Sequence, residues 1–71
     1  MKKILHIEGM TCGHCKMKVE KALGSLAPVE EVDVDLIEGI AEVELSNDLD
    51  DSFFVKQIDE AGYKLRSIEK L

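Results

Sequence analysis

Apolar and polar residues alternate in short stretches of the chain, which is the pattern of strands with one buried face. The first stretch is residues 2–8, where Leu5 and Ile7 share one face. Two more flank a turn at Glu38-Gly39 and predict a hairpin. Its inward positions are Val32, Val34, Leu36, Ala41, Val43 and Leu45. A last strand is predicted from Tyr63 to Ile68.

Two other stretches have apolar residues at helical spacing. The first helix is predicted from His14 to about Leu26, and Pro28 terminates it. Its apolar positions are Cys15, Val19, Ala22, Leu23 and Leu26. The second helix is capped by Asp50 or Asp51 and stops at Gly62. Its expected buried positions are Phe54, Val55, Ile58 and Ala61.

The predicted order of elements is βαββαβ, which indicates an α+β fold of the ferredoxin-like class. We expect a four-stranded antiparallel sheet with both helices on one face. The chain has 71 residues, so we interpret residues 1–71 as a single domain near the lower limit for a self-sufficient core. The initiating Met1-Lys2-Lys3 and the short tail after Ile68 lead us to expect a complete protein.

Composition excludes several classes of protein. Two cysteines are too few for a disulfide-stapled secreted scaffold, and 45% apolar residues are too many for a disordered chain. No segment approaches the roughly 20 apolar residues of a membrane span, and the apolar run after Lys3 is too short for a signal peptide. We therefore expect a cytoplasmic protein with reduced thiols and no membrane insertion.

Charge is distributed unevenly along the chain. Residues 22–55 hold ten acidic and no basic side chains, and the net charge is −6. A nucleic-acid partner is therefore not expected. Lys16, Lys18 and Lys21 lie close to the cysteines and could form a positive surface for an acidic partner protein. The alternative is an ordinary solvated helix face.

Cys12 and Cys15 are the only cysteines in the chain. Two residues separate them, so both thiols can bind one soft metal ion or close as a disulfide. They lie where the first strand pattern gives way to the first helix pattern. A helix N-terminus favours thiolate over thiol through its dipole and its unpaired N–H groups.

The motif and the element order together resemble the heavy-metal-associated domain, and within it the free-standing bacterial copper chaperones of the CopZ type. The resemblance runs over essentially the whole chain. It rests on four segments: Gly9-Met10-Thr11-Cys12-Gly13-His14-Cys15, Lys18-Val19-Glu20-Lys21-Ala22-Leu23, Val32-Asp33-Val34-Asp35 and Ile58-Asp59-Glu60-Ala61-Gly62-Tyr63. It implies a carrier that binds Cu(I) and passes it to a partner, typically a related domain on a copper-exporting P-type ATPase.

Ligand number and softness favour Cu(I), which accepts two thiolates, over zinc, which normally takes four ligands or three and a water. Relatives that prefer zinc commonly carry an acidic residue at the position of Thr11. We expect Cys12 to be the more exposed thiol and Cys15 to lie in the first helical turn. The alternative for Cys15 is a small buried side chain. Whether His6 reaches the sulfurs cannot be predicted from the sequence.

Further residues around the cysteines are expected to support the site. The resemblance implies that Met10 points into the core rather than binding copper, and that Tyr63 lies beside the metal, where it either shields the ion or closes the core. Thr11 and Gly13 are interpreted as loop geometry, with Gly13 leaving room near the sulfurs. His14 either tunes the thiolates, binds a further copper in a dimer, or faces solvent.

Other functions remain open at this point. A thiol–disulfide oxidoreductase would use the same cysteine pair, but no thioredoxin-like pattern surrounds it, so we expect a binding protein and not an enzyme. The cargo could instead be Hg(II), Ag(I), Cd(II) or Zn(II), and the chain could be a domain of a longer transporter. A copper-responsive repressor is an alternative recipient. We expect a monomer without metal, with a copper-bridged dimer as the alternative state.

Overall fold

The computed structural model describes residues 1–10 and 13–70. Its elements follow the predicted βαββαβ order. Their bounds are β1 Lys2–Glu8, α1 Gly13–Gly24, β2 Val29–Asp35, β3 Ile40–Leu45, α2 Asp51–Glu60 and β4 Lys64–Lys70. Neither helix in this part of the chain is long and apolar enough to cross a membrane.

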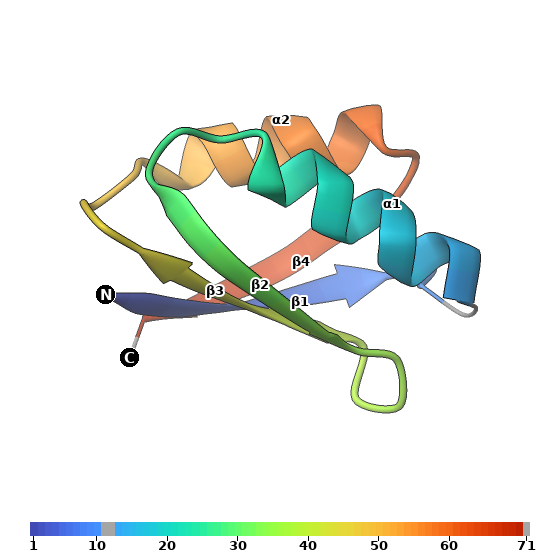
Figure 1. Cartoon of the computed structure of the whole chain (residues 1–71). Helices are drawn as coiled ribbons and strands as arrows, with labels where there is room; N and C mark the ends of the chain where they lie inside the picture. Colours follow the sequence, from blue (N-terminus) through green and yellow to red (C-terminus); the bar gives the residue numbers. More distant parts are fainter. Residues whose placement is uncertain (11–12, 71) are drawn as a thin grey trace.

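The four strands form one sheet in the order β2-β3-β1-β4, and each neighbouring pair is antiparallel. Both helices cover the same face of this sheet, and the other face is uncovered (Figure 1). This arrangement confirms the predicted ferredoxin-like fold. β1 ends and α1 begins at one end of the molecule, while the start of β1 and the end of β4 lie at the opposite end (Figure 1).

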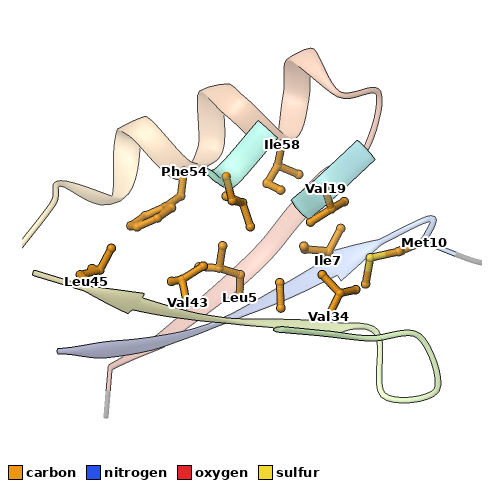
Figure 2. Close-up of a cluster of buried hydrophobic side chains, with 11 residues drawn as sticks. Leu5, Ile7, Met10, Val19, Val34, Val43, Leu45, Phe54 and Ile58 are labelled. Carbon is orange, nitrogen blue, oxygen red and sulfur yellow. The ribbon is translucent and has the colours of Figure 1, made fainter. Parts of the chain in front are cut away.

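The core lies between the sheet and the helices (Figure 2). Its buried residues are Leu5, Ile7, Met10, Val19, Leu23, Val34, Ala41, Val43, Leu45, Phe54 and Ile58. The inward positions predicted for β1 and β3 are all among them. Full burial of one large apolar side chain contributes about 1.5–3 kcal/mol, so these residues supply the main favourable contribution to folding.

The structure corrects two predictions about the helices: the burial of Val55 and the end of α1. Val55 was expected in the core but is 49% exposed. Phe54 and Ile58, four residues apart, already share the inner stripe of α2, and Val55 is rotated away from it by about 100°. α1 ends at Gly24 rather than near Leu26. Leu26 packs against the core from the turn that follows.

The helix α2 begins and ends at residues that suit helix termini. Asp50 is the N-cap, and its carboxylate accepts a hydrogen bond from the backbone N–H of Ser52. Ala61, predicted as a buried helical position, is the half-buried C-cap. Gly62 follows with a φ of 93°, a conformation that glycine adopts without steric cost. The chain then turns directly into β4.

Lys3 is a buried charge that the sequence pattern did not indicate, only 5% exposed. Its Nζ donates hydrogen bonds to the carbonyl oxygen of Leu49 (2.8 Å) and to Asp51 Oδ1 (3.0 Å), and lies 3.3 Å from Asp48 Oδ1. It also lies 5.4 Å from the centre of the Phe54 ring. Burial alone lowers the pKa of Lys3, but its hydrogen bonds to Asp51 and Asp48 outweigh burial and raise the pKa above its usual value. Lys3 therefore ties β1 to the start of α2.

Replacing Lys3 by Met keeps the apolar stem and removes the ammonium group. The Leu49 carbonyl and Asp51 then lose their charged donor, so we expect the free energy of unfolding to fall by about 1–3 kcal/mol. Chemical denaturation at neutral pH measures this change. Lys70→Met is the matched control, because Lys70 is 63% exposed and its Nζ lies 3.7 Å from Asp48 Oδ2. A loss above about 1 kcal/mol in the control would contradict a specific role for Lys3.

The same substitution should change the acid sensitivity of the fold. The hydrogen bond from Lys3, and secondly the charge of Lys70, lower the pKa of Asp48. The carboxylate of Asp48 is therefore protonated at a higher pH in the unfolded chain than in the folded chain. The stability that this carboxylate contributes is lost as the pH falls from about 3.9, the usual pKa of aspartate, through the lowered pKa of the folded state. We expect the acid-side fall in stability to be shallower in Lys3→Met than in the wild type. Denaturation curves across the acidic range test this, and identical pH profiles would contradict it.

Candidate functional site

The predicted site lies at the junction between β1 and α1. Thr11 and Cys12 lie outside the described residues, so the site is built here from the residues on either side. Gly9 follows β1 with a φ of 89°, which turns the chain at a position where a residue with a Cβ would be strained. Gly13 begins α1. The junction is therefore held between a strand end and a helix start.

Cys15 lies in the first turn of α1, as predicted. Its side chain is half-buried and packs against the core. The first turn of α1 carries no acidic residue, so no carboxylate in that turn opposes a negative charge on sulfur. The helix dipole and the N–H groups of the first turn favour the thiolate form at this place.

Met10 lies in the core and is 5% exposed. Figure 2 shows its side chain at the edge of the buried cluster, beside Ile7 and Val34. This is the position that a packing role requires. To act as a thioether ligand, Met10 would have to leave this contact and open a cavity in the core. The residue therefore anchors the start of the loop to the sheet.

The two predicted supporting residues at the start of α1 are both exposed. His14 faces solvent, and its role in tuning thiolates or binding a second metal stays a prediction. A Cβ added to Gly13 would meet no atom within 4 Å beyond its chain neighbours and its own helix backbone. The described surroundings thus do not demand glycine there, and its role in leaving room for the sulfurs also stays a prediction.

Tyr63, shortly after the end of α2, lies beside Gly9. It is half-buried and packs against the core. A Cβ added to Gly9 would lie 3.7 Å from Tyr63 Cδ1, so the ring covers the residue at which the loop starts. A shallow hollow of about 490 Å³ opens at this place, lined by Glu8, Gly9, Asp59, Gly62, Tyr63 and Lys64. The contact with Gly9 was not predicted, although a glycine directly after a strand is a signal for a close approach of backbone to another group.

His6 lies on the uncovered face of the sheet, between its cross-strand neighbours Ile40 and Ser67. Its Nε2 is 3.0 Å from Glu69 Oε1. Leu5 and Ile7, on either side of it, point into the core. His6 therefore points to the face of the sheet opposite to α1 and Cys15, which answers the question that the sequence left open.

The lysines of α1 do not all lie in one place. Lys18 and Lys21 are exposed, whereas Lys16 is half-buried. A groove of about 370 Å³ runs between the two helices, lined by Lys18, Lys21, Ala22, Gln57, Glu60 and Ala61. Two of the three predicted docking lysines thus border a shared groove. Lys16 lies nearer to the cysteines along the helix.

Residues 1–10 and 13–70 contain no group of three or more His, Cys, Asp or Glu side chains placed to hold a metal ion. Within this part of the chain, no ready-made zinc site of the usual kind accompanies Cys15. Metal binding by Cys12 and Cys15 stays a prediction from the sequence.

Comparison with known proteins identifies the family. The model of the heavy-metal-associated domain matches residues 4–64. The chain belongs to the heavy-metal-associated domain family. The match includes the junction, both helices and the hairpin, so the family assignment covers the site as well as the core.

Individual members of the heavy-metal-associated family are similar in sequence and in structure. The copper chaperone CopZ of Staphylococcus aureus is 48% identical over 42 residues, which cover 59% of this chain and 62% of that relative. A solved structure titled CopZ metallochaperone is 36% identical, with a TM-score of 0.87, and the match covers 93% of this chain and 100% of that one. A copper binding domain from HMA7, a P-type ATPase, is 28% identical with a TM-score of 0.82, covering 99% and 100%.

The packing role of Met10 leads to a prediction about stability. Met10→Ala should lower the free energy of unfolding by about 2–5 kcal/mol, because it leaves a cavity beside the sheet. Met10→Leu should cost less than about 1.5 kcal/mol and should bind Cu(I) as tightly as the wild type. Thermal denaturation and a competitive Cu(I) titration on the same samples measure both quantities. A folded Met10→Leu protein with greatly weakened Cu(I) binding would show instead that the thioether is a ligand.

Proposed function

We propose that this protein is a cytoplasmic carrier of Cu(I) that binds the ion through the thiolates of Cys12 and Cys15 and passes it to another protein. The observation that carries the proposal is the position of Cys15. It lies half-buried in the first turn of α1, three residues after the other thiol of the chain, on a fold shared with metal-carrying relatives.

The donor set suits Cu(I) because the ion is soft and is satisfied by two thiolates. Zn(II) would need further ligands from the protein or from solvent. His6 is paired with Glu69 on the opposite face of the sheet, and no cluster of three potential ligands exists among residues 1–10 and 13–70. The position of His6 supports two-coordinate binding over a tetrahedral site. The ion is cargo in this proposal.

Transfer requires that the ion is held tightly and still exchanges quickly. In the proposed mechanism an incoming thiolate of the acceptor attacks the ion, and one thiolate of this chain leaves before the other. Cys15 is packed against the core, so it is the natural candidate to retain the ion longest. Each step replaces one copper–sulfur bond by another and needs no oxidant or reductant, so the protein acts as a carrier rather than as an enzyme.

The relatives support both the cargo and the recipient. The relative from Staphylococcus aureus is named a copper chaperone, and the domain from HMA7 is named a copper binding domain of a P-type ATPase. We therefore propose the metal-binding domain of a copper-transporting P-type ATPase as the acceptor. Delivery to a copper-responsive repressor and a copper-bridged dimer stay predictions from the sequence.

The decisive test is an anaerobic titration with Cu(I) against a chromophoric competing chelator, with Zn(II) titrated in parallel. We expect tight Cu(I) binding near one ion per chain and far weaker Zn(II) binding, because only two thiolates are available. Cys12→Ser and Cys15→Ser should each weaken Cu(I) binding by orders of magnitude, since a hydroxyl is a poor ligand for a soft ion.

Two controls accompany the cysteine variants. Circular dichroism should show that both variants stay folded, since Cys15 is only half-buried and none of the buried core residues is changed. His14→Ser changes an exposed neighbour and should retain most of the affinity. A Cys15→Ser protein with wild-type affinity would refute the two-thiolate site.

The lysines of α1 are proposed to attract an acidic acceptor. Replacing Lys16, Lys18 and Lys21 together by Ser should slow Cu(I) transfer at low ionic strength, because the attraction between opposite charges steers the encounter. The effect should shrink as salt screens the charges. Stopped-flow transfer to the copper binding domain of HMA7 measures the rate.

The matched control replaces three basic residues elsewhere, Lys56, Arg66 and Lys70, by Ser, which changes the net charge by the same amount. We expect a smaller effect, because these side chains lie on α2 and β4. Equal rates in the two triple variants would indicate that only net charge matters and that α1 has no special role.

A further inference from the structure

Ile37 is an aliphatic side chain that the fold leaves outside. It lies in the turn between β2 and β3 and is 95% exposed. Isoleucine is among the residues most often buried. The exposed fractions of Met17 and Met1, the next highest among the large apolar side chains of the described residues, are 68% and 59%. Ile37 therefore presents almost its whole apolar surface to water.

The turn that carries Ile37 is fixed by hydrogen bonds. Asp35 Oδ1 accepts from the backbone N–H of Ile37 (2.9 Å) and of Glu38 (3.2 Å). The backbone N–H of Gly39 donates to the carbonyl of Asp35 (2.9 Å), and Gly39 has a φ of 69°. A side chain held on a fixed backbone loses little conformational entropy when it is buried by a partner, which favours binding.

The turn is attached to the strand that leads into the metal-binding junction. The backbone N–H of Ile7 donates to the carbonyl of Gly39 (2.9 Å), and Ile7 is followed closely by Gly9 and Met10. Figure 1 shows the β2–β3 turn at the same end of the molecule as the end of β1 and the start of α1. Ile37 and the junction are therefore parts of one end of the domain.

An acceptor that takes an ion from Cys12 and Cys15 must touch this end. A standard protein interface covers about 800 Å² on each partner, and the whole accessible surface of the described chain is 4474 Å². Such a footprint is roughly a sixth of the molecule, so it extends well beyond the loop. When the acceptor is a second copy of this chain, it presents the hollow beside Gly9 and Tyr63 at its own junction.

We infer that Ile37 is an apolar contact residue that is buried against the metal-accepting domain during transfer, a domain of the same heavy-metal-associated fold. The inference rests on the proposed function and adds to it a recognition residue outside the Cys12-to-Cys15 loop and outside α1. Ile37 does not touch the ion, so its removal should slow transfer without weakening Cu(I) binding.

The test uses a second copy of the chain as the acceptor, because it has the required fold. Nitrogen-15-labelled metal-free protein is mixed with unlabelled Cu(I)-loaded protein, and exchange spectroscopy over a range of concentrations gives the second-order rate of metal exchange. With Ile37→Asn in both copies we expect this rate to fall about five- to tenfold, the loss seen at the minority of interface residues that contribute appreciably to binding. Ile37→Val should restore most of it.

Val55→Asn is the matched control, since Val55 is another exposed β-branched side chain, 49% exposed, on α2. It should leave the exchange rate near that of the wild type, and Cu(I) affinity should be the same in all variants. An Ile37→Asn protein that exchanges as fast as the wild type, or a Val55→Asn protein that is equally slow, would overturn the inference and leave the proposed function intact. A wild-type chain that fails to bind Cu(I) would overturn both.

Discussion

The packing of α1 on the sheet determines where the thiol of Cys15 lies. Val19 and Leu23 are fully buried, and they follow Cys15 by four and eight residues. Residues at this spacing share one stripe of a helix. Burial of Val19 and Leu23 therefore turns Cys15 toward the same core, at the end of the stripe where the helix begins. On the strand side, Met10 is buried as well, so both sides of the loop are anchored.

The two faces of the domain differ in charge, and this difference follows from the strand register. On the uncovered face Glu31 lies opposite Glu44, and Asp33 lies opposite Glu42. Like charges in directly opposed positions destabilise a sheet. Lys2 relieves part of this cost, with its Nζ 3.3 Å from Glu42 Oε1. An acidic partner would be repelled by this face, so the lysine-bearing side of the domain is the favourable side for its approach.

Much of the fold could be predicted because local and tertiary preferences agree. The alternation in β1 and β3 marks one buried face, and the buried residues of the structure occupy that face. The prediction failed where periodicity alone had to choose between neighbours. Val55 is apolar and lies next to Phe54, but a helix of period 3.6 can bury only one stripe against a flat sheet. Leu26 continues the apolar pattern of α1, yet it reaches the core from a turn.

The sequence by itself determined the order of elements, the two-residue spacing between the cysteines and the family, because these depend on local spacing and residue chemistry. Tertiary structure decided how distant residues meet. Lys3 became a buried link to Asp51, the Tyr63 ring came to lie over Gly9, and His6 was directed away from Cys15 toward Glu69. Such contacts depend on strand register and on the closure of the chain around one core, and no local pattern of residues encodes them.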